Sequence, residues 1–184
     1  MPDTPMLYET AIASEIFGVD RSDLSPTAEW YDLVVCTADG LAHPWLPELP
    51  TASYAEIARV DSVVVSSIDD LDAEPDPELL AALRVAHQRG VRVASLCTGA
   101  FVLAAAGLLD GREATTHWMH ADDLARRYPR VDVRADVLYV DDGDVLTSAG
   151  KTAAIDLCLH LVRRDLGAAA ANACLLYTSD AADE

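Results

Sequence analysis

Cys97 is the residue whose position most directly suggests chemistry. It lies in the string Ser95-Leu96-Cys97-Thr98-Gly99, between an apolar run that predicts a strand (91–96) and one that predicts a helix (99–106). Small residues two positions before and after a nucleophile are typical of a nucleophile elbow, a tight strand-to-helix turn. The free N–H groups and partial positive charge of the helix start favour a thiolate there. From these residues alone, Cys97 is either a reactive thiol or a buried core thiol.

The composition excludes several classes of protein. Thirteen basic and 31 acidic residues give a net charge of −18, which repels phosphate backbones and anionic lipid. We therefore expect no direct nucleic-acid contact by this chain and no membrane binding, and no apolar run reaches the ~18 residues of a membrane span. The four cysteines form no CxxC pair and no zinc-type cluster with histidine, so we expect no metal, no cofactor and no disulfide framework. These features predict a reduced, cytoplasmic protein.

Strand and helix patterns alternate along the 184 residues, a length that suits one domain. Such alternation predicts an α/β fold with a parallel sheet and crossover helices. Asp142-Gly143 lies inside an alternating stretch and predicts a hairpin. The Pro-rich stretch 43–50 predicts a surface loop. The expected strands are 30–37, 61–67, 91–96 and 113–118, and the expected helices are 9–18, 77–89, 99–106, 120–128 and 151–166.

Two blocks of sequence carry a family resemblance. "ASLCTGAFVLAAAGLLDGREATTHW" and "VLYVDDGDVLTSAGKTAAIDLCLHLVRRDLGAAAAN" resemble the ThiJ/PfpI superfamily, a branch of the class I glutamine amidotransferase-like fold. The most similar subgroup is the amino-terminal domain of AraC-type transcriptional regulators, and the resemblance covers residues 6–173. It implies a flavodoxin-like three-layer sandwich with a mostly parallel sheet, commonly dimeric, whose reactive cysteine stands at the carboxyl end of a central strand.

The resemblance also implies roles for particular residues. The reactive cysteine of the family falls on Cys97, the acidic residue that hydrogen-bonds it on Glu9, and a histidine near the thiol on His117 in "TTH". A carboxyl group beside a thiolate repels it unless the carboxyl keeps its proton and donates a hydrogen bond. Such a pair titrates as a coupled unit. The subgroup carries an aspartate at Asp156, where a solvated or dimer-contact role competes with a functional one.

The candidate oxyanion donors are the N–H groups of Thr98 and Gly99, together with Ser67. Members of the family often have Pro-Gly where this chain has Ser66-Ser67, so the backbone freedom of that glycine is lost. The Ser67 hydroxyl is the substitute donor that these positions offer.

The resemblance predicts departures at both ends. The superfamily has a central strand ahead of the Glu9 helix, and we expect it to be missing here, which leaves a slot in the sheet and a domain (6–173) incomplete at its amino end. Residues 174–184, including Cys174, resemble a translated sequencing adapter and are expected to be a non-native tail. In the regulators a DNA-binding helix-turn-helix domain follows instead.

Three functions stay open on these residues. The first is the ligand- or redox-sensing domain of an AraC-type regulator, a homodimer with an unknown small-molecule effector that reaches DNA through the helix-turn-helix domain. The second is a cysteine-dependent hydratase, glyoxalase-like or amidase-like enzyme acting on a small carbonyl or isocyanide compound. The third is a thiol redox sensor in which Cys97 is oxidised to a sulfinate. The subgroup resemblance favours the first.

Overall fold

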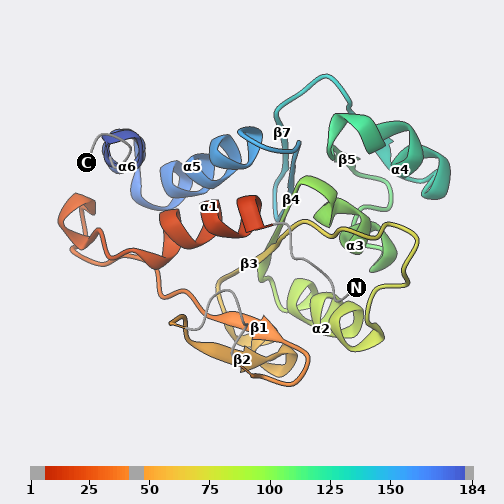
Figure 1. Ribbon diagram of the computed structural model, residues 1–184, viewed down its shortest axis with the longest axis horizontal. Helices are drawn as coiled ribbons and strands as arrows, with labels where there is room; N and C mark the ends of the chain where they lie inside the picture. Colours follow the sequence, from red (N-terminus) through yellow and green to blue (C-terminus); the bar gives the residue numbers. More distant parts are fainter. Residues whose placement is uncertain (1–6, 42–47, 181–184) are drawn as a thin grey trace.

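The centre of the molecule is a four-stranded sheet (Figure 1). The computed structural model describes residues 7–41 and 48–180. The strand order is β3 (Ser62–Val65), β4 (Arg92–Leu96), β8 (Val145–Ser148) and β7 (Tyr139–Asp142). The first three strands are parallel, and β7 runs antiparallel to β8. Gly143, with φ of 81°, makes the expected hairpin turn between them.

Helices cover both faces of this sheet, as the alternating pattern predicts. α1 (Leu7–Gly18), α5 (Ala153–Leu166) and α6 (Ala168–Asp180) lie on one side (Figure 1). α2 (Pro77–Gln88) and α3 (Ala100–Ala105) lie on the other, and α4 (Ala121–Arg127) packs beyond the β7 side. This is the flavodoxin-like α/β sandwich that the family resemblance implies.

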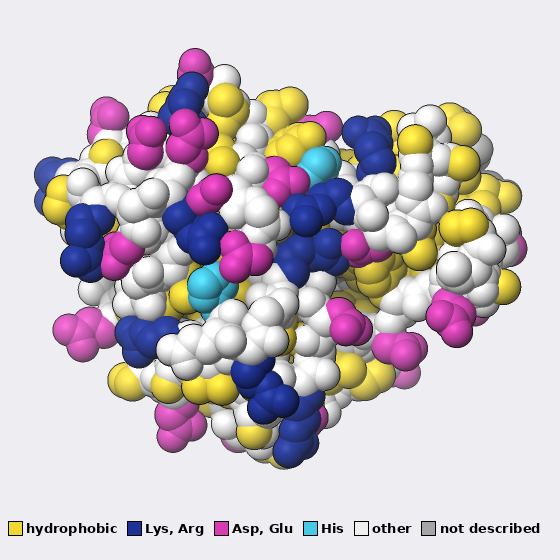
Figure 2. All heavy atoms as spheres, turned by 180° about the vertical axis from the view of Figure 1, so that it is seen from behind, with side chains coloured by type: hydrophobic (Ala, Val, Ile, Leu, Met, Phe, Trp, Pro, Cys, Tyr) yellow, Lys and Arg dark blue, Asp and Glu magenta, His cyan; other side chains and the backbone are white. Residues whose placement is uncertain are grey.

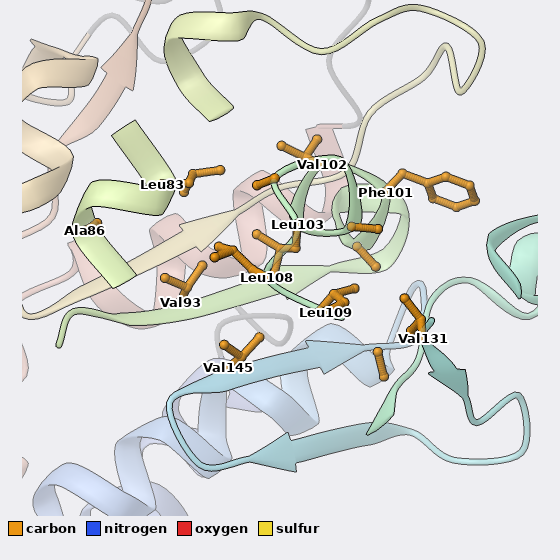
Figure 3. Packing of buried hydrophobic residues seen from close by; sticks show 14 of the residues in the cluster. Leu83, Ala86, Val93, Phe101, Val102, Leu103, Leu108, Leu109, Val131 and Val145 are labelled. Atoms are coloured by element: carbon orange, nitrogen blue, oxygen red, sulfur yellow. The ribbon is translucent and has the colours of Figure 1, made fainter. Parts of the chain in front are cut away.

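Each face of the sheet has its own hydrophobic core. Val93 on β4 belongs to a core cluster that also contains Leu83 of α2 and Phe101 and Leu103 of α3 (Figure 3). The opposite face of β4 carries Leu96, which belongs to a second cluster with residues of α1, α5, α6 and β8. Side chains alternate between the two faces of a strand, so the continuous apolar run of β4 fills both cores.

α2 shows how local sequence determines an element. Asp76 is the N-cap, and its side chain accepts a hydrogen bond of 2.8 Å from the Glu78 N–H. Pro77 occupies the first helical position, where its missing N–H costs nothing. Gly90, with φ of 85°, ends the segment in a conformation that other residues rarely adopt.

The expected edge elements are shorter than predicted. Of the strand expected at 30–37, only β1 (Val35–Thr37) forms, and it pairs in parallel with β2 (Thr51–Ser53), which the sequence did not predict. β2 directly follows the Pro-rich stretch 43–50 that was expected as a loop, of which residues 43–47 lie outside the described residues. The strand expected at 113–118 contains only β5 (Glu113–Ala114), which pairs with β6 (Asp132–Val133).

The short helices and α6 complete the chain. Among the described residues, four 3-10 helices connect the main elements: η1 (Ser22–Leu24), η2 (Tyr54–Arg59), η3 (Cys97–Gly99) and η4 (Trp118–His120). α6 continues across the domain end expected at Ala173, and Cys174 is fully buried in the second core cluster. Burial of Cys174 gives this part of the expected tail a packing role in the fold.

The β1–β2 pair is separate from the four-stranded sheet (Figure 1). Within residues 7–41 and 48–180, β3 is an edge strand that pairs only with β4.

Candidate functional site

Cys97 lies at a strained turn at the carboxyl end of β4. Its side chain is fully buried, and its φ of 55° is in the left-handed region, which costs a residue other than glycine about 1–3 kcal/mol. The Thr116 hydroxyl donates to the Cys97 carbonyl at 2.9 Å. The Thr98 hydroxyl donates to the Ile68 carbonyl at 2.7 Å and accepts from the Ile68 N–H at 2.9 Å. These three hydrogen bonds hold the turn against its strain.

Gly99 allows this turn to pack against the end of β3. A Cβ at this position would lie 2.5 Å from the Val65 carbonyl oxygen and 2.6 Å from the Ser66 carbonyl oxygen. Both atoms belong to the backbone, so neither can move aside cheaply. Glycine is therefore required by close approach, because its φ is an ordinary −56°.

Glu9 is a buried carboxyl group beside the thiol. Its side chain is fully buried on α1, with one oxygen accepting from the Ser67 hydroxyl at 3.1 Å and the other from the Lys151 N–H at 3.3 Å. Burial, followed by the negative charge of Glu9, raises the pKa of the Cys97 thiol to about 11. The Thr98 N–H and the Lys151 ammonium oppose this rise in pKa.

The helix start was expected to favour a thiolate at Cys97, and the structure corrects that expectation. A lowered thiol pKa requires positive charge or N–H donors to outweigh the cost of burial. Here the thiol is buried next to a carboxylate, and those two effects exceed the contribution of the Thr98 N–H. The thiol is therefore mainly protonated at neutral pH.

His117 is the third candidate residue near the thiol. Its Nδ1 accepts from the Met119 N–H at 3.3 Å, and its ring stacks on Trp118 with 5.8 Å between centroids. Burial, His120 and Lys151 lower the pKa of His117, so this half-buried imidazole is neutral at pH 7.

Gly150 is a site residue that sequence reasoning missed. A Cβ on Gly150 would lie 2.2 Å from His117 Cδ2 and 3.0 Å from Cys97 Sγ. Gly150 therefore lets the thiol and the imidazole pack around the same point of the backbone. The structure thus brings Cys97, Glu9 and His117 together, from three distant parts of the sequence.

Lys151 follows Gly150 and was also missed. Its φ of 61° is in the left-handed region, and its ammonium lies 5.9 Å from the centre of the Tyr8 ring. The sequence did contain a signal for these two residues, because the Gly-Lys pair directly follows "TSA" at the end of a strand. A loop in that position meets the elbow at the carboxyl edge of a parallel sheet.

The candidate oxyanion donors have defined positions. Ser67 donates its hydroxyl to Glu9, and the Ser66 hydroxyl lies 2.7 Å from the Thr10 hydroxyl. Neither serine has a positive φ, so this backbone forms without glycine. Thr98 directs its N–H to the thiol, while Gly99 abuts the end of β3.

Other titratable residues lie elsewhere. Asp156 is exposed on α5, and Cys158 is buried in the core. His87 pairs with Asp144 at 2.9 Å, and His160 with Asp141 at 2.5 Å. Across the described ranges, no group of three or more His, Cys, Asp or Glu residues could hold a metal ion. Over those same ranges, no helix is long and apolar enough to cross a membrane.

The fold and the site together define a class of protein. It is a flavodoxin-like α/β domain with a cysteine on a strained strand-to-helix turn beside a buried carboxyl group. The sequence profile of the DJ-1/PfpI family matches residues 63–164, more than half of the chain. The chain belongs to the DJ-1/PfpI family.

Three curated proteins are similar to this chain in sequence. An uncharacterised protein from the cpoL 5' region of Streptomyces lividans is 57% identical over 104 residues, 54% of this chain and 73% of that protein. The HTH-type transcriptional regulator CdhR of Pseudomonas aeruginosa is 42% identical over 104 residues, 56% of this chain and 30% of the regulator. The isonitrile hydratase of Pseudomonas putida is 34% identical over 141 residues, 75% of this chain and 58% of the hydratase. The chain thus spans only about a third of the regulator's length.

A solved structure agrees on the fold. The crystal structure of an AraC family transcriptional regulator from Pseudomonas putida superposes with a TM-score of 0.75 and 22% identity, covering 95% of this chain and 94% of that one. At this identity the likeness shows the fold alone.

Proposed function

We propose that this chain is the ligand-sensing domain of an AraC-type transcriptional regulator, with the effector contacting the residues around Cys97. The observation that carries the proposal is the 42% identity to an HTH-type regulator over 104 residues. Similarity to further HTH-type regulators, such as GbdR at 30% identity over 138 residues, supports the same class.

The electrostatics of the site support ligand sensing over thiol oxidation. Redox-sensing cysteines are accessible and have lowered pKa values. Cys97 is fully buried and its pKa is about 11, so its thiol is a poor target for peroxide at neutral pH. A neutral thiol, a neutral imidazole on His117 and the Lys151 ammonium instead offer polar contacts to a small effector.

The surface beside the site supports a contact role. Trp118 is 71% exposed and Met119 63% exposed, directly after His117. Exposed apolar groups of this size mark places where a ligand or a second subunit binds. We therefore propose a homodimer whose effector site lies close to this loop. Effector binding would then shift the equilibrium between two conformations of this domain, and the DNA-binding domain would respond to that shift.

A second function rests on the isonitrile hydratase relative, which matches 75% of this chain. In that case the Glu9 carboxylate would take the proton of the Cys97 thiol, and the thiolate would attack the carbon of a small isocyanide or carbonyl compound. Glu9 would then return the proton to the adduct as general acid. The N–H groups of Thr98 and Gly99 would hold the developing anion. The pKa of about 11 weighs against this function, because the thiol must first lose its proton.

One experiment separates the two functions. The chain is mixed with single compounds from a panel of small amines, carboxylates, carbonyl compounds and isocyanides, and both thermal unfolding and product formation are followed. Sensing predicts that a compound raises Tm without turnover, by the equivalent of about 2.7 kcal/mol at a concentration 100 times its Kd. His117→Ala should abolish the rise in Tm, whereas the exposed control Asp156→Asn should retain it. Turnover by the wild type that Cys97→Ser abolishes would establish the enzyme instead.

A further inference from the structure

The backbone fixes the tautomer of the His117 imidazole. The Met119 N–H donates to His117 Nδ1 at 3.3 Å, which makes His117 the N-cap of η4. A backbone N–H can only donate, so Nδ1 carries no proton and the proton of the neutral ring lies on Nε2. Burial above all lowers the pKa of His117, which keeps the ring neutral at pH 7. His117 is therefore a hydrogen-bond donor through Nε2 and has no acceptor nitrogen left.

The ring carbon next to Nε2 lies at the thiol. A Cβ on Gly150 would lie 2.2 Å from His117 Cδ2, and the same point is 3.0 Å from Cys97 Sγ. Nε2 is the ring nitrogen bonded to Cδ2, whereas Nδ1 is held by Met119. None of the described residues accepts a hydrogen bond from Nε2. A ligand that contacts the thiol is therefore within reach of an N–H that has no partner in this part of the protein.

Lys151 brings a positive charge to the same place. It is the only lysine of the chain and directly follows Gly150. Burial dominates the pKa shifts of Cys97 and His117, but the Lys151 ammonium acts on both groups, so it lies within electrostatic reach of both. Lys151 and Cys97 also share a positive φ, a strained conformation that is common at functional sites.

Among the described residues, no carboxylate forms an ion pair with this ammonium. The ammonium instead lies 5.9 Å from the centre of the Tyr8 ring. Most arginines of the chain do pair with aspartate or glutamate. Basic side chains near the centre of the face in Figure 2 likewise lie beside acidic ones. In a chain with 31 acidic and 13 basic residues, Lys151 is thus a cation at the site that can still pair with an anion.

Glu9 does not take up the charge of Lys151. One Glu9 oxygen accepts from the Ser67 hydroxyl and the other from the backbone N–H of Lys151. Glu9 is fully buried, whereas Lys151 is exposed. The negative charge of Glu9 stays beside the thiol and repels a second negative charge there. The site therefore favours an anion that carries one charge over an anion that carries two.

We propose that the effector of this domain carries a carboxylate group, which pairs with the Lys151 ammonium and accepts the Nε2–H of His117. This ligand class rests on the proposed sensing function and adds the chemistry of the effector to it. A carboxylate has a single charge and two oxygens, so it can accept from both donors at once. Hydrogen bonds between charged groups are shorter and stronger than neutral ones, so an amide of the same size should bind less well. Lys151 and His117 thus determine the specificity of the site.

The test compares two alkylating reagents that differ only in this group. Iodoacetate carries a carboxylate and iodoacetamide an amide, and with each reagent the Cys97 thiolate attacks the CH₂ carbon and displaces iodide. The rates of both reactions are measured at one pH by mass spectrometry of the tryptic peptide 93–112, which contains Cys97. Both reagents react with the same thiolate, so a change in the pKa of Cys97 cancels in the ratio of the two rates.

Lys151→Met keeps the length of the side chain and removes its charge. It should lower the ratio of the iodoacetate rate to the iodoacetamide rate about tenfold, as expected for the loss of a hydrogen bond between charged groups. Lys151→Arg should keep the wild-type ratio. His117→Asn can still cap η4 but lacks the Nε2–H, and it should lower the ratio about fivefold. The matched control Arg163→Met removes a positive charge at an exposed position of α5 and should leave the ratio unchanged.

A second measurement needs no variant. Propionate should slow the alkylation of wild-type Cys97 by iodoacetamide, because it occupies the two donors, and propionamide at the same concentration should not. If Lys151→Met fails to fold by circular dichroism, this protection still decides the result.

Two results would overturn the proposal. The first is an equal ratio of rates in the wild type, Lys151→Met and His117→Asn, and the second is protection by propionamide as strong as that by propionate. If a compound without a carboxylate then raises Tm, the sensing function stands and only the carboxylate is wrong. A ratio that depends on Lys151, found together with turnover of carboxylates, would instead keep the ligand class and contradict sensing.

Discussion

Replacing Glu9 by glutamine should make the Cys97 thiol more reactive. Glu9 is fully buried, and its charge is the second cause, after burial, of a Cys97 pKa of about 11. Glutamine has nearly the same shape and still accepts one hydrogen bond from Ser67 or from the Lys151 N–H. The substitution therefore removes the charge while changing the packing little.

The size of the effect follows from the thiolate fraction. With a pKa of about 11, roughly one thiol in 10³ is ionised at pH 8. A neighbouring charge commonly shifts a pKa by about one unit or more, so Glu9→Gln should raise the thiolate fraction about tenfold. In the wild type the alkylation rate should increase about tenfold per pH unit until pH approaches 11, and the variant profile should lie about one unit lower.

The assay is alkylation by iodoacetamide between pH 7 and 10, followed at the tryptic peptide 93–112, which contains Cys97 and no other cysteine. The matched control is Ser67→Ala, which deletes a hydrogen bond to Glu9 but keeps its charge. This control should not accelerate alkylation. A Glu9→Gln rate equal to or below the wild-type rate over the whole range would refute the charge argument.

The other predictions concern stability, each measured by urea unfolding. Gly99→Ala should cost about 1–3 kcal/mol, because its Cβ meets two backbone carbonyls, and a cost near zero would show that the turn is loose. Thr98→Val should cost about 1–3 kcal/mol, because the Ile68 N–H and carbonyl lose their shared partner; an unchanged midpoint would contradict this. The folded-state pKa of Cys97 is raised from 9.0 to about 11, so its contribution is intact below pH 9 and is lost as pH rises towards 11. The Cys97→Ser variant should lose less stability than the wild type between pH 9 and pH 11. If the free energies of unfolding of the two proteins change in parallel with pH, the prediction is wrong.

The parallel core of the fold was predictable because its signals are local. β3 and α2 lie within one or two residues of their expected bounds, because a run of β-branched residues and a capped amphipathic helix are signals that depend only on neighbouring residues. β1 and β2 were not predicted correctly, because a three-residue strand has almost no periodicity. Their existence depends on a partner that lies 16 residues away in the sequence, as in the pair Val35 and Thr51.

The candidate site was predictable in its residue types and not in its electrostatics. The elbow sequence indicated Cys97, and the family resemblance indicated Glu9 and His117. The fold places all three residues close together. The helix start suggested a favoured thiolate, yet the pKa is raised. Sequence cannot show how deeply a thiol is buried or which carboxyl group faces it, and these two factors determine the direction of the shift.

By itself, the sequence determined the alternation of strands and helices, the turn at Cys97 and the membership of a family, because each depends on neighbours along the chain. The tertiary structure alone decided that Gly150 touches both Cys97 and His117, and that Glu9 accepts the N–H of Lys151 across 142 positions. Contacts between distant segments arise only when the sheet and its helices pack, and such contacts determine the chemistry of the thiol.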